Sequence, residues 1–331
     1  PITDRSGQGP NAPTDHRTAP GPLAGPGALR FARPPRAARL PSGMDPNTPS
    51  RPGPVRPRGP RAGFTLVELL VAVSVIALLI GVLLPALTGA RRAAADAASS
   101  SNLRQLAVGV AAYQVDFGPE LPQFRVDTAT GEPAYGSSGD NIGALFGGKT
   151  GSLPGFPGAN FGIDRIGAER RPLNTYVWEG PIPDDETDAA RAFELPPFDD
   201  PADAGMPGSP LAAMGLDTSS MYELLGSSYT LNDHAPDEDP NDEPWWTLVP
   251  ERGGRMPAVA NPTRTWLIGT HPIYNFDDGG DRRMLWNGSG DGGVSANLAF
   301  VDGHVRAGLA VPPGPEHTTS EYTFLPEPGW I

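Results

Sequence analysis

The sequence contains no cysteine, so the protein forms no disulfide bond and has no thiol nucleophile. It also lacks the H-E-x-x-H motif of zinc peptidases, the G-x-S-x-G motif of serine hydrolases and the spacing of an EF-hand calcium loop. No catalytic constellation can be assembled from the residues that remain, and we expect the protein not to be an enzyme. The histidines, which form no motif, are His16, His234, His271, His304 and His317.

Basic charge is scarce outside the first 63 residues. Residues 1–63 hold ten Arg and three acidic residues, a net charge of +7, whereas residues 64–331 hold fifteen Lys or Arg and thirty-five acidic residues, a net charge of −20. An acidic body without a basic patch argues against nucleic-acid binding. By the positive-inside rule, the basic segment stays in the cytoplasm and the body lies in the periplasm or outside the cell.

The first 63 residues show no helix or strand periodicity. They contain fifteen Pro and nine Gly, which predicts a disordered leader. The alternative is a Pro-rich arm that binds nucleic acid or an SH3-type domain. The chain does not begin with Met, and a start at Met44 would leave a leader of twenty residues, so we expect translation to start there.

A long apolar run follows the leader. From Leu69 to Ala90 there are 22 residues without an ionisable side chain. As a helix they would extend ~33 Å, enough to cross a hydrocarbon core of ~30 Å. A secretory signal has a shorter apolar region and an Ala-x-Ala-like cleavage site, which is absent here. We therefore predict a transmembrane span over about 64–87.

The junction between leader and span, Gly63-Phe64-Thr65-Leu66-Val67-Glu68, resembles the N-terminal signal of type IV prepilins and type II secretion pseudopilins. The resemblance implies that prepilin peptidase cleaves after Gly63 and methylates the new N-terminus at Phe64. Glu68 is then the fifth mature residue, where the family keeps its acid, and Pro85 the twenty-second, where many pilins carry a helix-kinking Pro. An ordinary signal anchor would explain the apolar run but not Glu68.

Glu68 is the one acidic residue within the predicted span. A carboxylate costs ~2.5–3.5 kcal/mol at the bilayer centre and less near the end, so it normally marks a function or a partner. The amine produced by cleavage before Phe64 is a natural partner, within one chain or on a neighbouring subunit. Pairing between chains would fix the axial stagger of subunits, because an unpaired charge in an apolar filament core is expensive.

The helical pattern continues to about residue 116. Leu103, Leu106, Val110 and Tyr113 recur at helical spacing, which predicts an apolar stripe that packs on a sheet. The Phe117-Gly118-Pro119 segment ends the helix. Pro85 removes one backbone hydrogen bond and is expected to bend the helix around residues 81–84.

Residues 117–331 form a loop-rich body. Strands are predicted at 227–231, 245–249 and 265–270, and Asp302-Gly303 predicts a hairpin with a type I′ turn between 297–301 and 304–309. This hairpin, and the segment Arg171-Pro-Leu-Asn-Thr-Tyr176, resemble a bacterial pseudopilin-like subfamily. Its members carry a His nine residues before the Asp-Gly pair, where this chain has Gly292. His304 is expected to be a surface strand residue rather than a ligand.

Four further patterns have competing interpretations. Residues 143–150 match the phosphate-binding G-x-x-x-x-G-K-[ST] motif, but the Gly- and Pro-rich residues after them cannot open a helix, so we expect a glycine-rich loop and no nucleotide. The acidic stretches 181–205 and 232–244 are expected to be solvated loops. The adjacent Trp245 and Trp246 are expected to serve packing rather than ligand stacking. Oxygen-rich side chains among glycines suggest a Ca²⁺ site, with the candidate ligands Asp277, Asp278, Asp281 and Asp291.

These observations predict an α+β fold, with a long N-terminal helix, transmembrane in its first half, packed on a small antiparallel sheet of a loop-rich, pilin-like body. We expect a leader at 1–63, the helix at 64–116 and an extracytoplasmic domain at 117–331. The predicted function is that of a structural subunit of a type II secretion pseudopilus or type IV pilus-like filament, first resident in the inner membrane. Its expected partners are prepilin peptidase, other pilin subunits and membrane lipid. The alternative is a membrane-anchored protein that binds a ligand or secreted cargo.

Overall fold

The computed structural model describes residues 63–134, 139–235, 245–250, 252–275, 293–312, 314 and 316–327, without the side chains of Trp245 and Trp246. The chain divides into two units, Pro1–Gly63 and Phe64–Ile331, and the description concerns the second. The predicted disorder of the leader, the Ca²⁺ candidates (Asp277, Asp278, Asp281 and Asp291) and Gly292 lie outside the described residues.

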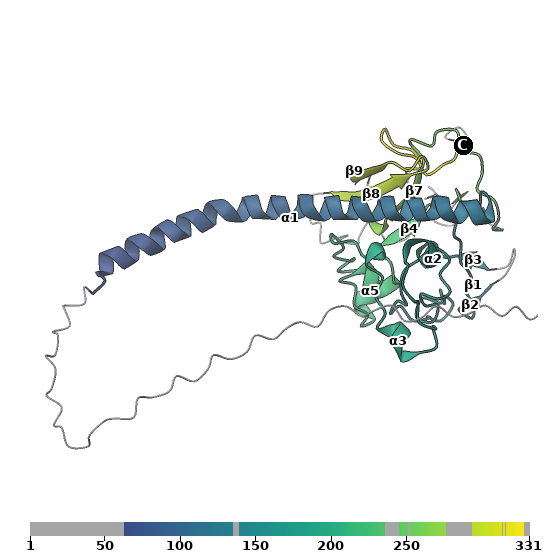
Figure 1. Ribbon diagram of the computed structural model, residues 1–331, viewed down its shortest axis with the longest axis horizontal. Coiled ribbons are helices and arrows are strands. Elements are labelled where there is room, and N and C mark those ends of the chain that lie inside the picture. The colour runs from purple at the N-terminus through teal and green to yellow at the C-terminus, as the bar shows by residue number, and fades with distance from the viewer. Residues whose placement is uncertain are drawn as a thin grey trace, which may run out of the picture. The chain divides into compact units, whose positions relative to one another are not determined.

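A single helix, α1 (Leu66–Phe117), dominates this unit (Figure 1). Its 52 residues correspond to a length of about 78 Å at ~1.5 Å per residue. It ends where the sequence predicted, because the dihedral angles of Gly118, 70° and −160°, do not continue the helix. Pro85 lies inside the continuous helix, and Figure 1 shows α1 curving over its N-terminal half.

The two halves of α1 have different surroundings. Every residue from Phe64 to Ala94 is exposed within this unit, although most of these residues are apolar. Beyond them the helix buries the predicted stripe of Leu103, Leu106 and Val110, which packs against strands and loops of the body. Helical spacing therefore identified the packed face correctly, while the first half packs against no part of the body that the structure describes.

The main sheet has four strands in the order β4-β7-β8-β9, and all neighbours are antiparallel. These strands are β4 (Tyr229–Leu231), β7 (Trp266–Thr270), β8 (Val294–Phe300) and β9 (Val305–Val311). α1 packs against β7, β8 and β9. A separate apolar cluster joins Trp266, Leu298 and Phe300 to the short 3-10 helix η3 (His271–Tyr274) and to residues 322–325. Both the helix and the C-terminal segment thus bury the sheet.

The β8–β9 hairpin confirms the prediction from Asp302-Gly303, but the turn type was wrong. The amide of Gly303 donates to the carbonyl of Phe300 at 2.8 Å, and the amide of Phe300 donates to the carbonyl of His304 at 2.9 Å. This pattern gives a three-residue loop with Gly303 at a φ of 87°, rather than a two-residue type I′ turn. The Asp302 carboxylate accepts the His304 amide at 3.1 Å, which favours the longer loop. His304 pairs with Phe300 directly after this loop, one residue before β9, and is partly exposed.

The rest of the body consists of short elements joined by loops. Its two small sheets pair β1 (Arg125–Asp127) with β2 (Glu132–Pro133) and β3 (Asp140–Asn141), and β5 (His234–Ala235) with β6 (Trp245–Trp246). The short helices are η1 (Gly143–Phe146), α2 (Asn174–Val177), α3 (Asp188–Arg191), η2 (Pro196–Phe198), α4 (Pro210–Ala213) and α5 (Met221–Leu225). The predicted α+β fold with a loop-rich body is confirmed.

The segment that matches the phosphate-binding motif has a structural role. Gly143–Phe146 is a 3-10 helix, and no helix begins between Thr150 and Asn174, so the strand-loop-helix cradle of a nucleotide site is not formed here. Lys149 is buried, and its ammonium pairs with Glu194 at 2.9 Å and with Glu223 at 2.7 Å. Two carboxylates therefore neutralise the ammonium charge that a bound phosphate would need.

A buried arginine connects the loops around this segment. The Arg171 guanidinium donates to the carbonyls of Ile166, Ala144, Gly147 and Leu225 at 2.9–3.3 Å. Burial lowers the pKa of Arg171 to about 9, so the group is still charged at neutral pH. Gly226 makes this arrangement possible, because its φ is 84° and a Cβ there would lie 1.9 Å from the Lys149 carbonyl oxygen.

The sequence predicted that the acidic stretch 181–205 is a solvated loop, but some of its carboxylates are buried. The Asp185 side chain is 4% exposed and accepts the amides of Gly167 and Glu169 and the Nε of Arg170 at 2.7–3.0 Å. Asp200 is also buried. In a loop-rich body, backbone amides without ladder partners need acceptors, and these carboxylates supply them.

Polar side chains accompany the apolar contact between α1 and the sheet. Ser99 on α1 is fully buried, and its hydroxyl accepts from the Nδ2 of Asn297 on β8 at 2.9 Å. The same hydroxyl lies 3.5 Å from that of Tyr229 on β4 and interacts with the Asp200 carboxyl. The docked position of α1 is thus fixed by hydrogen bonds as well as by packing.

Candidate functional site

The candidate site is the junction at which the chain enters α1. Gly63 and Phe64 precede the helix, and Thr65, its N-cap, has extended dihedral angles of −80° and 151°. Phe64 is 78% exposed, and a Cβ on Gly63 would meet nothing within 4 Å. The peptide bond between Gly63 and Phe64 therefore lies before the helix, in accessible backbone, as a proteolytic site requires.

Thr65 and Glu68 form a reciprocal cap at this junction. The Glu68 amide donates to the Thr65 hydroxyl oxygen at 3.2 Å, and Oε2 of Glu68 accepts the Thr65 amide at 2.8 Å. The Thr65 hydroxyl also donates to Oε2 at 2.8 Å. Two amides that the first helical turn leaves unpaired are satisfied in this way.

The sequence analysis missed this cap, although its signal was present. The pattern Thr65-x-x-Glu68 directly before an apolar run is the signature of a capping box. Glu68 thus has a local role that needs neither a membrane nor a neighbouring subunit. Both bonds to the carboxylate use Oε2, and within the described part of the chain Oε1 accepts no hydrogen bond. A carboxylate that caps its own helix can therefore still meet an amine through Oε1.

The apolar half of α1 meets the requirements of a membrane span by length and composition. Its most apolar window has no residue buried within the protein. The two hydroxyl side chains in this part of the helix are satisfied internally, because Ser74 donates to the Leu70 carbonyl at 2.8 Å and Thr88 donates to the Leu84 carbonyl at 3.0 Å. Internal bonding of this kind is what a hydrocarbon environment demands of polar groups.

Comparison with known families identifies this junction. Residues 58–84 match the prokaryotic N-terminal methylation motif, which includes Gly63, Phe64 and Glu68 and most of the apolar half of α1. The chain is therefore a protein with a prepilin-type N-terminal signal. No curated protein and no solved structure matches the chain.

The other candidate site that the sequence predicts is the Ca²⁺ site. Among the residues that the structure describes, no group of three or more acidic or histidine side chains could hold a metal ion. The candidate Ca²⁺ ligands lie outside those residues, so that site stays a prediction. The predicted roles of Gly63, Phe64, Glu68 and Pro85 also stay predictions.

Proposed function

We propose that the protein is a pilin- or pseudopilin-like subunit. Prepilin peptidase cleaves after Gly63 and methylates Phe64, the first half of α1 holds the protein in the inner membrane, and the subunit then joins a type II secretion pseudopilus or type IV pilus-like filament. The observation that carries this proposal is the exposure of the whole stretch from Gly63 to Ala94 in its own fold, directly after a prepilin-type signal.

The free energy of exposing this stretch to water explains why it needs an apolar partner. Its large apolar side chains between Phe64 and Leu87 are 48–86% exposed. Fully burying one such side chain contributes roughly 1.5–3 kcal/mol, so leaving all of them in water would cost more than the stability of a typical domain. Lipid before assembly, and the same helices of neighbouring subunits after it, supply the apolar surroundings.

The charges on either side of the span support one orientation. Ten Arg precede the span within residues 1–63, whereas Arg91 and Arg92 are the only basic residues directly after it. The positive-inside rule therefore favours a cytoplasmic leader and a periplasmic body. This orientation presents the junction at Gly63 to the cytoplasmic face of the membrane and keeps the acidic body away from it.

Glu68 would serve this function in two successive ways. In the precursor it caps α1 and so fixes where the helix begins, two residues after the cleaved bond. After cleavage a free amine appears at Phe64, and the Glu68 carboxylate can neutralise it within the chain or on a neighbouring subunit. A neighbour bound by this charge pair would be held at a defined axial stagger.

Mass spectrometry of the N-terminus from native membranes tests the proposal. We expect a mature chain that begins with N-methyl-Phe64. A Gly63→Val variant is the matched control and is expected to block cleavage. The substitution is expected to leave the fold undisturbed, because Gly63 is exposed and a side chain there meets no other atom. A wild-type protein that retains its leader in a host with active prepilin peptidase would refute the proposal.

A second candidate is a membrane-anchored protein whose body binds a ligand or secreted cargo. It is favoured by a pocket of about 700 Å³ next to the C-terminal end of α1, within the size range of small-molecule sites. Deletion of the gene distinguishes the two candidates. Loss of secretion of other proteins favours the filament subunit, whereas a ligand-specific defect with intact secretion favours the binding protein.

A further inference from the structure

The outer side of the second half of α1 carries a regular pattern of exposed residues. They recur at alternating intervals of three and four positions, and nearly all of them are small or apolar. In chain order they are Ala90, Ala94, Ala97, Ser101, Arg104, Val108, Ala111 and Val115. Val108 is 65% exposed and Val115 is 84% exposed. This spacing, which we call the seam, is that of a helix that packs lengthwise against a second helix.

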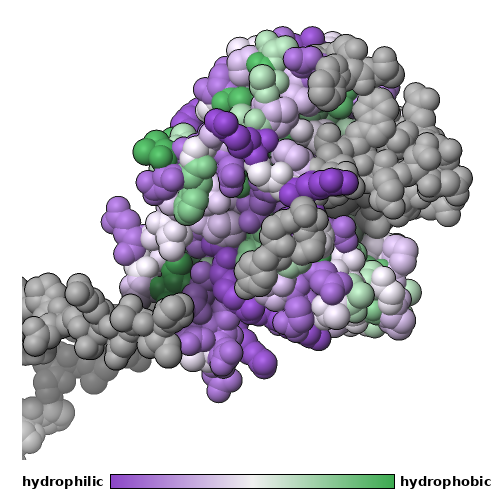
Figure 2. All heavy atoms as spheres, turned by 90° about the vertical axis from the view of Figure 1, so that its right-hand side faces the viewer, coloured by the Kyte–Doolittle hydropathy of each residue, from purple (hydrophilic) through white to green (hydrophobic). Residues whose placement is uncertain are grey.

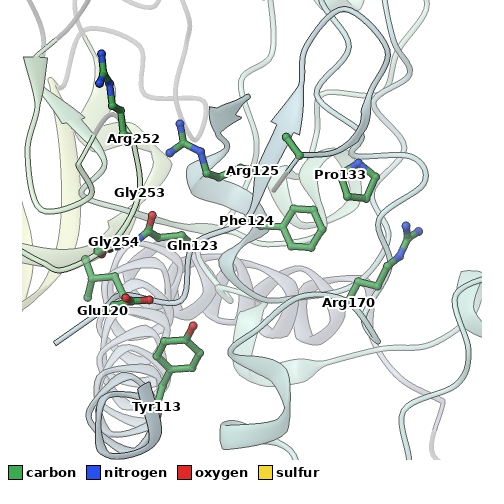
Figure 3. A pocket seen from close by; sticks show the side chains of 12 residues that line it. Tyr113, Glu120, Gln123, Phe124, Arg125, Pro133, Arg170, Arg252, Gly253 and Gly254 are labelled. Atoms are coloured by element: carbon green, nitrogen blue, oxygen red, sulfur yellow. Dashed lines mark hydrogen bonds between the residues drawn. The ribbon is translucent and has the colours of Figure 1, made fainter. Parts of the chain in front are cut away.

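The seam is separate from the sides of α1 that contact the body. The stripe through Leu103 and Val110 is buried, and Tyr113 lines the pocket at the end of the helix (Figure 3). The face seen from the C-terminal end of α1 is mostly hydrophilic, with scattered apolar residues (Figure 2). Outside α1, Met214 is the one exposed large hydrophobic side chain among the described residues. The seam is therefore the main apolar feature that the described body leaves uncovered.

The same spacing continues without interruption into the apolar half of α1. There it passes through side chains that are 48–86% exposed, namely Leu66, Leu69, Val73, Ile76, Ile80, Leu83 and Leu87. Every face of this half is apolar, so the residues beyond it, where the other faces are polar or packed, fix which positions belong to the seam. From Leu66 to Val115 the seam extends ~75 Å along one helix.

We propose that two copies of the chain pair along this seam as a parallel dimer in the membrane. The proposal rests on the membrane insertion that is part of the proposed function, but not on cleavage or filament assembly. Two copies inserted into one membrane have parallel helices with their spans at the same depth. Equal positions of the two seams then lie opposite each other, as the a and d positions of a parallel coiled coil do.

The area of the seam matches what a dimer needs only when both halves of α1 take part. The part beyond the span, from Ala90 to Val115, is ~39 Å long and ~10 Å wide, so it would bury ~780 Å² in total. A specific interface buries at least ~1,000 Å². With the apolar half included the total is ~1,500 Å², within the range of stable complexes. The second copy thus uses the whole seam.

The residue types of the seam also fit a pair of close helices. Ala90, Ala94 and Ala97 are small, which lets two backbones approach closely just beyond the span. Val108 and Val115 are β-branched and occupy successive a positions, a choice that favours two-stranded coiled coils.

Arg104 is the only charged residue of the seam, and in the dimer it lies near its counterpart in the second copy. It also lines a groove of about 500 Å³ between α1 and α2, which Glu179 lines as well. The long side chain can therefore turn out of the seam towards this carboxylate. Like charges across an interface nevertheless oppose association, so Arg104 limits the strength of the dimer.

Disulfide cross-linking in membranes tests the dimer. The chain contains no cysteine, so a single introduced thiol reports only on its own position. The full chain is produced in a host without prepilin peptidase, where it keeps its leader and enters no filament, and the membranes are oxidised with copper phenanthroline. Ala94→Cys and Val115→Cys lie in the seam, whereas Arg92→Cys lies on the opposite side of α1 and is the matched control. We expect at least fivefold more linked dimer from each seam variant than from the control.

Several outcomes would overturn the proposal. Equal cross-linking at all three positions would show random collision, and cross-linking at Ala94 without Val115 would show that only the spans associate. A membrane-bound chain without cross-links would contradict the dimer and leave the proposed function intact. A chain that is absent from the membrane fraction would contradict both.

A substitution that strengthens the dimer completes the test. Arg104→Leu, combined with Val115→Cys, is expected to raise the fraction of linked dimer about two- to fivefold, because it removes the like charge from the seam. Arg255→Leu removes an exposed arginine outside α1 and is expected to leave that fraction unchanged. A decrease with Arg104→Leu, or an equal increase in both variants, would contradict the position of Arg104 between the two helices.

Discussion

Replacing Asp200 by Asn is expected to make the protein more stable at neutral pH. Asp200 is 4% exposed and lies beside Ser99, where α1 docks on the body. Its Oδ1 accepts the Ala202 amide at 2.9 Å, and an asparagine can keep that bond through its own Oδ1. Burial, the largest influence, raises the pKa of Asp200 from its ordinary 3.8 to about 6, because the ionised carboxylate is poorly solvated.

The sign of the pH dependence follows from this raised pKa. Well below pH 3.8 the carboxyl is protonated in both the folded and the unfolded chain, so its ionisation does not lower the free energy of unfolding. As pH rises towards 6 the unfolded chain loses the proton first, and the free energy of unfolding falls until both states are ionised. The pKa difference corresponds to about 3 kcal/mol at pH 7.5, of which about 2 kcal/mol develops between pH 4.5 and 7.5.

Urea unfolding of wild type and Asp200→Asn at these two pH values, followed by tryptophan fluorescence, measures the effect. We expect the stability advantage of the variant to grow by about 2 kcal/mol between pH 4.5 and 7.5. Asp217→Asn is the control that is expected to show no change. Asp217 is exposed, and hydrogen bonds from Ser219 lower its pKa from its ordinary 3.8, so it is mostly ionised in both the folded and the unfolded chain throughout this pH range, and the stability difference from wild type is expected to stay constant. An advantage of Asp200→Asn that does not change with pH would refute the reasoning.

Three further predictions address the helix, the body and the junction. Gly109→Ala is expected to destabilise the protein by about 1 kcal/mol in the same urea assay. Its Cβ would lie 2.5 Å from Cγ1 of Val177 on α2, and this overlap costs roughly 1–3 kcal/mol, which outweighs the gain in helix propensity. Gly89→Ala is the control, because its Cβ would have no atom within 4 Å, and it is expected to be neutral or stabilising. Arg171→Met leaves four buried carbonyls without their donor and is expected to cost at least about 3 kcal/mol, so an unfolding midpoint equal to that of wild type would contradict the assigned role. Glu68→Val removes both the cap and the charge, whereas Glu68→Gln removes the charge and keeps the cap. Both variants are expected to be cleaved and inserted but to fail in filament assembly. Thr65→Ala, which weakens the cap by ~1 kcal/mol but keeps the charge, is expected to assemble. Filaments from Glu68→Gln at wild-type yield, seen by electron microscopy, would assign Glu68 to the cap alone.

The features of this chain that have local causes could be predicted from the residues alone. Composition and spacing predict four features of α1, because neighbouring residues in the chain decide them. These features are its length, its end at Gly118, its apolar first half and the stripe through Leu103 and Val110. The Asp302-Gly303 hairpin was also visible for this reason. The capping box of Thr65 and Glu68 belongs to the same class, since three residues separate its partners, and its pattern was overlooked rather than absent.

The burial of polar residues in the body, and the groups that they contact, could not be predicted in this way and follow from the folded arrangement. Asp185 and Asp200 looked like members of a solvated acidic loop, yet both are buried, because unpaired amides of a loop-rich body need acceptors. The carbonyls around Arg171, and the pocket between Arg125 and Arg252, join residues far apart in the chain. No local pattern marks such partners, since a loop can bring any distant backbone group to a side chain, and only the folded arrangement shows which one it brings.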